Sequence, residues 1–152
     1  MKLIKASVKH FHTVKFIVKT TIETVYPDYY PKGAVDFFLC HHSDEGIKKA
    51  IMDGGVYLIQ DDDRIIGTGS INGNEISRLF VLPQYQGNGF GTAIMDELER
   101  IIFNHHSQIV LDASLPAYGM YVHRGYIPVE YHRLKTENGH YLCYHVMKKL
   151  RN

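Results

Sequence analysis

The sequence is poor in the features that mark secreted or membrane-bound proteins. It has only two cysteines in 152 residues, Cys40 and Cys143, which is too few for the disulfide framework of a small secreted domain. No run of about 18 apolar residues is present to span a bilayer, and the opening segment MKLIKASVKH lacks the apolar core of a signal peptide. We therefore expect free thiols, no membrane partner and a cytoplasmic location.

An excess of charge of one sign is also missing. Lysine and arginine number 17 against 16 for aspartate and glutamate, which gives a net charge of +1 without any block of like charge. Non-specific binding to nucleic acid is therefore not expected. The chain has no low-complexity segment, internal repeat or Pro/Gly/Ser linker, so we predict a single domain over residues 1–152.

The spacing of apolar residues predicts an α/β fold. Helical intervals occur first, and from residue 56 onward the period becomes that of strands, separated by turn sequences such as DDDR and NGN. This order predicts a mixed, mostly antiparallel central sheet flanked by helices. The expected helices cover 10–25, 33–41, 43–53, 89–103 and 116–124, and the expected strands 2–7, 56–60, 65–71, 75–81, 108–113, 126–135 and 140–149. On the exposed face of helix 89–103, Asp96 and Arg100 are expected to pair at i,i+4.

The segment VLPQYQGNGFGTAIMDELER, residues 81–100, places three alternating glycines between a strand and a helix. The backbone N–H groups at a helix N-terminus have no partner within the helix, and glycine allows both positive φ and close approach of a ligand. The helix dipole adds to the attraction for an anion. A phosphate or pyrophosphate is the ligand that this stretch favours, the alternative being a plain tight turn.

Two common phosphate-binding motifs are excluded. The loop has no lysine followed by Ser or Thr at the spacing of a P-loop. The dinucleotide-binding fingerprint G-x-G-x-x-G, started at Gly87, requires a third glycine at position 92, where this chain has Thr92. That fingerprint also belongs to a parallel sheet, whereas the strands expected before this loop are antiparallel.

The loop resembles motif A of the GNAT superfamily of acetyltransferases, [QR]-x-x-G-x-[GA] after a strand L-x-V-x-P. Gln86, Gly89 and Gly91 fit the first part, and LFVLP at 79–83 fits the second. The stretch AYGMYVHRGY, residues 117–126, also matches the downstream A-x-x-[FLM]-Y-x-x-x-G-[FY] pattern of that family. The order of elements is similar over nearly the whole chain, except that 27–55, where such proteins usually shape acceptor specificity, is only generically alike.

This resemblance implies acetyl-CoA as the cofactor and an N-acetyltransferase reaction on a primary amine, in a direct ternary complex. The pyrophosphate would bind the amides of 87–92, and the pantetheine arm would pair with the exposed edge of 79–81. A backbone N–H near Val81 would stabilise the oxyanion. The implied cofactor-binding residues are Leu79, Phe80, Val81, Gln86, Gly87, Asn88, Gly89, Phe90, Gly91, Thr92, Ala117 and Tyr121.

Two catalytic residues follow from the same resemblance. Tyr121, one helical turn after Ala117, is the candidate acid for the departing thiolate, the alternative being a core tyrosine. An alkylamine with a pKa near about 10.4 is almost fully protonated at pH 7, so a base is needed. Glu75 lies where many members carry a carboxylate that works through water; the alternative is a solvated residue after the NGN turn. Asp112 is a second candidate base.

The acceptor is expected to be a small-molecule or peptide amine of unknown identity. Tyr26, Tyr29, Tyr30 and Phe37 around the segment YPDYYPKG are candidates for its pocket, and Asp28 and Asp36 could attract a cation. Ordinary packing of a loop is the alternative. The histidines in CHH and NHH match no zinc spacing, so no metal is expected. The edges of the last two strands could support a homodimer.

Two other functions fit the sequence. The chain could be a sensing domain that binds acyl-CoA without turning it over, or a nucleotide-binding module for another phosphorylated ligand. Loss of turnover in a Tyr121→Phe variant separates an enzyme from a sensor. A comparison of stabilisation by CoA, ATP and NAD separates the last function from both others.

Overall fold

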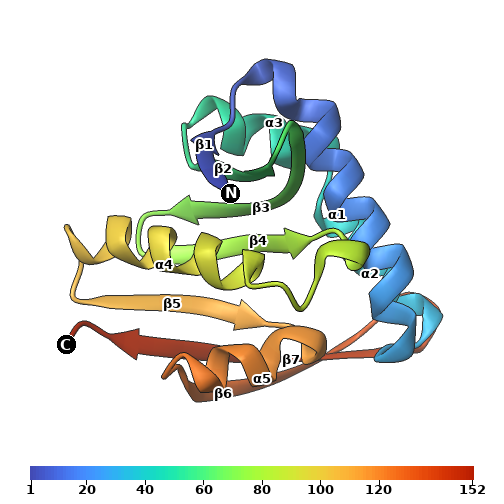
Figure 1. Cartoon of the computed structure of the whole chain (residues 1–152). Coiled ribbons are helices and arrows are strands. Elements are labelled where there is room, and N and C mark those ends of the chain that lie inside the picture. The colour runs from blue at the N-terminus through green and yellow to red at the C-terminus, as the bar shows by residue number, and fades with distance from the viewer.

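The computed structural model describes all 152 residues and contains one seven-stranded sheet, with the strand order β1-β2-β3-β4-β5-β7-β6 (Figure 1). Every neighbouring pair is antiparallel except β4 with β5, so the predicted mixed, mostly antiparallel sheet is confirmed. The strands are β1 (Lys2–Lys5), β2 (Val56–Asp61), β3 (Arg64–Asn72), β4 (Glu75–Val81), β5 (Gln108–Ala113), β6 (Ile127–Lys135) and β7 (Tyr141–Leu150).

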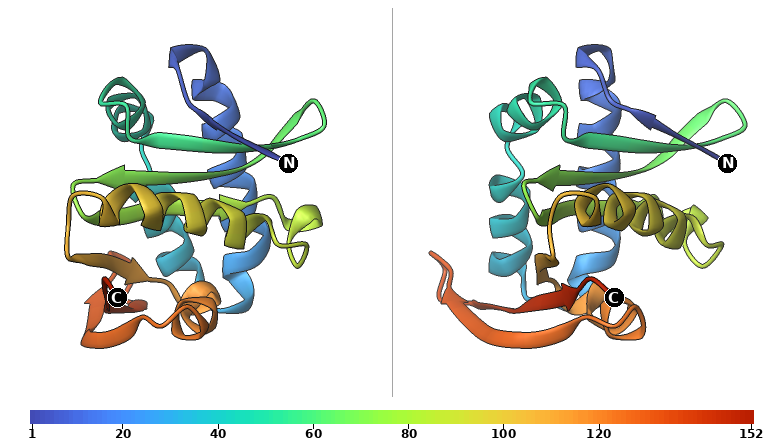
Figure 2. Two further views of the ribbon diagram at one scale, coloured as in Figure 1. Left: turned by 60° about the vertical axis from the view of Figure 1, so that its left-hand side comes forward. Right: turned by 90° about the vertical axis from the view of Figure 1, so that its left-hand side faces the viewer.

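Helices cover both faces of the sheet, with α4 and α5 on one face and α2 and α3 on the other (Figures 1 and 2). The helices are α1 (Phe11–Val25), α2 (Lys32–His41), α3 (Asp44–Met52), α4 (Phe90–Phe103) and α5 (Leu115–His123). Each end lies within one residue of its predicted position. As its sequence indicates, Ser43 caps α3 by accepting a hydrogen bond from the N–H of Gly46.

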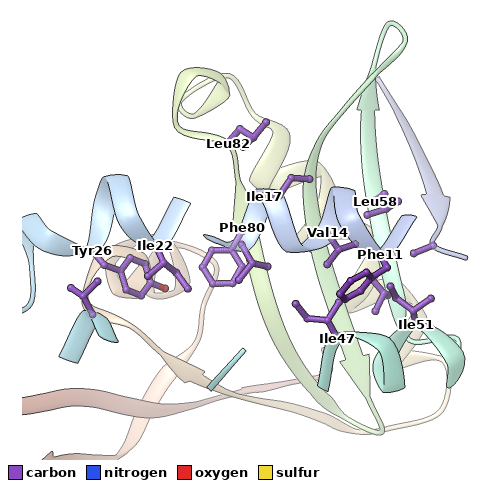
Figure 3. Packing of buried hydrophobic residues seen from close by; sticks show 14 of the residues in the cluster. Phe11, Val14, Ile17, Ile22, Tyr26, Ile47, Ile51, Leu58, Phe80 and Leu82 are labelled. Carbon is purple, nitrogen blue, oxygen red and sulfur yellow. The ribbon is translucent and has the colours of Figure 1, made fainter. Parts of the chain in front are cut away.

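The sheet separates two apolar cores. On one face, side chains of α1, α2 and α3 pack around Leu58 and Phe80, and Figure 3 shows Phe80 projecting from β4 among the side chains of α1. On the other face, Ile94 and Leu98 of α4 pack against the sheet together with Tyr121 of α5. The strand β4 contributes side chains to both cores.

A β-bulge interrupts β4. Thr68 pairs with Phe80 but Ser70 pairs with Ser77, so Gly69 alone opposes two residues of β4, Arg78 and Leu79. The backbone of Arg78 has φ +48°, a value that non-glycine residues rarely adopt. The extra residue turns the side chains that follow it to the opposite face of the sheet.

The two central strands β4 and β5 separate soon after they meet. They run parallel and pair at a single register position, Glu75 with Val110. The remainder of β4 has β3 on one side and no strand on the other, while β5 continues along β7. This separation opens the sheet at its centre, beside Val81.

The outer edge of the sheet is formed by β6, which carries exposed apolar residues such as Ile127, Val129 and Tyr131. Figure 2 shows the β6–β7 hairpin extending past the other strands, and its turn reaches α2, where the N–H of Gly33 donates to Nδ1 of His140 at 2.8 Å. A homodimer through this edge stays a prediction. No helix of the chain combines the length and apolar character needed to cross a membrane.

The predicted pair of Asp96 with Arg100 is wrong. Arg100 instead makes two hydrogen bonds to Glu97, three residues earlier on α4. Asp96 pairs with Arg124, which lies just after α5. An i,i+3 partner on the same helix was available to Arg100, and Arg124, just after α5, approaches Asp96 from outside α4.

Candidate active site

A cavity of about 530 Å³ lies where β4 and β5 separate. Its walls come from β4, the end of α1 with α2, the loop before α4, and α5. The structure brings most of the predicted residues together here, from segments far apart in the sequence. The predicted residues that line the cavity are Tyr26, Tyr29, Phe37, Glu75, Leu79, Phe80, Val81, Gln86, Gly87, Phe90, Gly91, Asp112, Ala117 and Tyr121.

Some predicted residues lie outside the cavity lining. Asn88, Gly89 and Thr92 belong to the same glycine-rich turn but are not part of the wall. The aspartates Asp28 and Asp36 are also absent from it, and Asp36 pairs with Lys32 on the surface.

Tyr30 also lies outside the cavity, in contrast to its expected place in the acceptor pocket. It is buried, and its hydroxyl donates to the carbonyl oxygen of Cys143 at 3.0 Å and accepts from the N–H of Leu115 at 2.8 Å. Burial raises the pKa of this hydroxyl to about 12. Tyr30 therefore joins α5 to β7 and has a structural role.

The backbone amides of the glycine-rich turn, at the edge of the cavity, are unpaired. None of the N–H groups from Gly87 to Thr92 donates to an acceptor within the chain. Gly87 and Gly89 have φ of +77° and +86°, which an L-residue with a side chain rarely adopts. No heavy atom lies within 4 Å of the place where a Cβ would stand on either residue. The turn therefore leaves room for a ligand beside the N-terminus of α4.

The side chain of Gln86 stabilises this turn from within. Its Nε2 donates to the carbonyl oxygen of Val81 at 2.9 Å, and Thr21 Oγ1 donates to the same oxygen at 3.4 Å. Gln86 is among the predicted cofactor-binding residues, and in the structure its side-chain amide closes the loop. Asn88 adds two further bonds to the carbonyls of Tyr85 and Gln86.

The N–H of Val81 points into the gap between β4 and β5. Successive residues of a strand direct their N–H groups to opposite edges. The N–H of Leu82 donates to Ile66 on β3, so that of Val81 faces away from β3, where β4 has no partner strand. This donor is therefore available to a ligand, while the carbonyl of Val81 is already occupied.

Tyr121 and Glu75 differ strongly in environment. Tyr121 is 5% exposed, and burial raises the pKa of its hydroxyl well above the ordinary value. It therefore stays protonated at neutral pH. The side chain of Glu75 is exposed at the cavity rim, yet partial desolvation and the nearby Asp112 carboxylate raise its pKa. Glu75 is thus a weaker acid than a free glutamate and a correspondingly stronger base.

Contacts at the far end of the cavity tie α1 to α5. The hydroxyl of Tyr26 donates to Ser114 Oγ at 3.3 Å, and the Tyr26 ring packs edge-on against Phe38. Ser114 directly precedes α5, so this contact helps to set the position of Tyr121 across the cavity. Tyr26 is itself buried at 6% exposure, while Tyr29 and Phe37 are 50% and 40% exposed at the entrance.

Sequence reasoning did not identify several residues of the wall, most notably Arg78 and His42. The signal for Arg78 was a charged residue inside a predicted strand whose other members are mainly apolar. His42 follows α2 as its C-cap residue, as expected for a helix-end histidine, but its ring also packs against Phe80 and lines the cavity. No group of three or more His, Cys, Asp or Glu side chains is arranged to hold a metal ion.

The sequence pattern of the chain matches a known family. Residues 25–150 match the model of the acetyltransferase (GNAT) domain, which is most of the chain. The chain belongs to the GNAT acetyltransferase family. The GNAT match includes the glycine-rich turn, Glu75 and Tyr121, and it covers every residue of the cavity lining except Thr21.

Solved GNAT structures share the fold over almost the full length. A GCN5-related N-acetyltransferase from Rhodopseudomonas palustris superimposes with a TM-score of 0.88 at 24% identity, covering 99% of this chain and 95% of that one. The PaiA N-acetyltransferase from Thermoplasma acidophilum, in complex with coenzyme A, gives a TM-score of 0.72 at 16% identity and covers 99% and 98% of the two chains.

One relative is similar in sequence over a shorter stretch. It is an aminoglycoside 2'-N-acetyltransferase from Mycolicibacterium fortuitum, 27% identical over 96 residues. The aligned part covers 63% of this chain and 45% of the relative, so this chain matches less than half of that protein.

Proposed function

We propose that the protein transfers an acetyl group from acetyl-CoA to a primary amine. The observation that carries this proposal is the row of free amides from Gly87 to Thr92, at the edge of a cavity that also holds Tyr121 and Glu75. Membership of the GNAT family supports the reaction type, and a relative and structural neighbours are N-acetyltransferases.

The residues present fit coenzyme A. The amides of the turn lie at the N-terminus of α4, where the helix dipole is equivalent to about half a positive charge, so they would hold the pyrophosphate. The free edge of β4 offers the N–H of Val81 to the amide-bearing pantetheine arm. Bound acetyl-CoA would supply an activated thioester carbonyl, and the chain supplies the groups that position it and move protons.

Glu75 is the residue we assign to deprotonate the amine. Its raised pKa makes it a better proton acceptor than an ordinary glutamate. Asp112 lies close enough to contribute to that rise and is the second candidate. Both carboxylates lie on the cavity wall, so either can also attract the ammonium form of the acceptor before its proton is removed.

Tyr121 is the residue we assign to protonate the leaving thiolate. Its buried hydroxyl keeps its proton at neutral pH, and its place on α5, four residues after Ala117, puts it on the cavity that the open edge of β4 also lines. Neither cysteine lines the cavity. Acetyl transfer would therefore occur directly from donor to amine, with no acylated cysteine.

Ligand-induced stabilisation tests this proposal before any acceptor is known. Saturation at about 100 times the Kd adds about 2.7 kcal/mol to the free energy of unfolding. Coenzyme A and acetyl-CoA are expected to raise the melting temperature, and ATP and NAD are not. Release of free thiol from acetyl-CoA with an amine panel then measures turnover. Equal stabilisation by ATP or NAD would contradict the cofactor assignment, and CoA binding without turnover on any amine would indicate a sensing domain.

A further inference from the structure

Arg78 is one of the residues that line the cavity, and its side chain has no counter-charge within the chain. Arg78 is the only lysine or arginine among the residues that line the cavity. Its Nε is buried and has no hydrogen-bond partner, and the side chain belongs to none of the ion pairs of the chain. A half-buried cation is normally paired, so this group is suited to bind an anion from outside the chain.

The backbone holds Arg78 in this place at a cost. Its φ of +48° belongs to the left-handed region, which is unfavourable for a non-glycine residue and persists only where the surroundings impose it. The bulge directs the side chain toward α3, where Nη2 lies 3.0 Å from the place where a Cβ would stand on Gly46. Such strain is common at binding sites, and here it aims a charge at the face that carries α2 and α3.

His42 lies beside this charge. The His42 ring packs edge-on against Phe80 at 5.4 Å, and its Nδ1 is buried without a partner. Burial, together with the charges of Arg78 and His41, lowers the pKa of His42 to about 3, so the ring is neutral at pH 7. A neutral imidazole can donate one hydrogen bond, and His42 also lines the cavity, so it adds a second polar group beside Arg78.

The charges of the cavity are arranged in two parts. Glu75 and Asp112 form the acidic part, beside the place where β4 and β5 separate. Arg78 and His42 form the other part, next to α2 and α3 and the aromatic rings of Phe38 and Phe80. A ligand with an amine at one end and an anion at the other matches both parts.

We propose that the acceptor amine also carries a carboxylate, as an amino acid does, and that this carboxylate binds to Arg78 with His42 beside it. The inference rests on the proposed acetyltransferase function and specifies its acceptor class. The aromatic wall favours an acceptor with an apolar side chain. Polycationic amines such as aminoglycosides offer no anion to Arg78 and are expected to be poor acceptors, although a relative carries that activity in its name.

Matched pairs of acceptors test this inference with the wild-type protein. Phenylalanine, leucine and methionine are compared with their carboxamides, which keep the amine but lack the negative charge. Hydrogen bonds to a charged group contribute about 1.5–3 kcal/mol, which corresponds to a preference of roughly 10- to 150-fold. We expect kcat/KM for the carboxylates to exceed that for the amides by at least about tenfold. Equal values, or a preference for the amides or for kanamycin, would overturn the inference.

The Arg78→Gln variant should abolish this preference while the KM for acetyl-CoA is unchanged. Arg133→Gln is the matched control, since it removes the same charge from β6, where Arg133 lies over the ring of Tyr141 and outside the cavity. The melting-temperature shift with coenzyme A shows that each variant is folded. An Arg78→Gln variant that retains the full carboxylate preference contradicts the inference.

A measurement without turnover separates this inference from the proposed function. In the presence of coenzyme A, N-acetylphenylalanine should stabilise the wild-type protein more than N-acetylphenylalaninamide does, and Arg78→Gln should remove the difference. If coenzyme A itself does not stabilise the protein, the proposed function is wrong. If coenzyme A stabilises it but the two products do so equally, only the carboxylate site is wrong.

Discussion

Gln86 donates from its side-chain amide to the carbonyl oxygen of Val81, 2.9 Å away, and so closes the glycine-rich turn onto the strand that precedes it. The bond holds the free amides of the turn beside the cavity without using any of them. The bond also occupies the carbonyl of Val81. The N–H of the same residue is not involved in it and stays available as a donor at the free edge of β4.

A Gln86→Ala substitution is therefore expected to weaken coenzyme A binding without abolishing it. The loss of one partly buried hydrogen bond costs about 0.5–1.5 kcal/mol, which corresponds to an increase in Kd of roughly 2- to 12-fold. Isothermal titration with coenzyme A measures this change. Gln60→Ala is the control, because Gln60 similarly bonds a loop carbonyl, that of Asp62, far from the cavity. Equal Kd values for Gln86→Ala and wild type would show that the turn does not need this bond.

Tyr121→Phe is expected to lower kcat by about 10²-fold or more, the range for loss of a general acid. Coenzyme A affinity should change little, because the ring remains and the lost hydroxyl makes no hydrogen bond within the chain. Tyr118→Phe is the matched control on the same helix, since Tyr118 packs against His145 and does not line the cavity. Similar kcat losses in both variants would indicate that Tyr121 acts through packing alone.

The activity should rise with pH through the pKa of Glu75. A base works in its deprotonated form, and desolvation together with Asp112 raises this pKa above the ordinary glutamate value. The acidic limb of kcat/KM should therefore lie above that value. In Glu75→Gln the acidic limb of the kcat/KM profile should disappear, and the rate should then follow only the deprotonation of the amine substrate. In Asp112→Asn the acidic limb should move to lower pH, because the carboxylate that helps to raise the pKa of Glu75 is gone.

The raised pKa of Glu75 should also make the stability of the protein depend on pH. A carboxyl whose pKa is raised in the folded state binds its proton more tightly there than in the unfolded chain. Stability is therefore lost as the pH rises from the unfolded pKa through the folded one. Urea denaturation across this pH window compares the free energy of unfolding of wild type with that of Glu75→Gln. The pH-dependent part of their difference should vanish below both the folded and the unfolded pKa of Glu75. A wild-type stability that rises more steeply with pH than that of the variant contradicts the raised pKa.

Most of the fold could be predicted from local patterns. Apolar spacing placed every helix end within one residue, because helix periodicity and capping residues such as Ser43 are properties of adjacent positions. The glycine-rich turn was predicted for the same reason. Its unpaired amides follow from the helix terminus itself, and its positive φ values follow from glycine.

Long-range geometry is what the sequence did not reveal. Strict alternation along 75–81 would place Ile76, Arg78 and Phe80 on one face. The bulge at Arg78 instead leaves Ile76 packed with α4 and Phe80 packed with α1. Whether a strand bulges depends on its partner, here Gly69 of β3. Tyr30 was misplaced for a similar reason, since its hydroxyl partners on Leu115 and Cys143 are more than 80 residues away.

Glu99 should contribute far more to stability than its neighbour Glu97 on the same helix. Glu99 is 8% exposed and accepts hydrogen bonds from Arg124, Lys149 and Tyr126, which join α4 to the end of α5 and to β7.

In Glu99→Ala, two partly buried cations lose their main partner, and removal of one member of such a network typically costs about 3–5 kcal/mol. Glu97→Ala is the control. Glu97 is paired with the exposed Arg100, and pairs of that kind contribute about 0–1 kcal/mol. Urea denaturation of both variants measures the two costs.

Since Arg124 directly follows α5, the Glu99 variant should also lose turnover before it unfolds, as Tyr121 is no longer held in place. Equal unfolding free energies for the two variants would mean that solvent, rather than Glu99, neutralises Arg124 and Lys149.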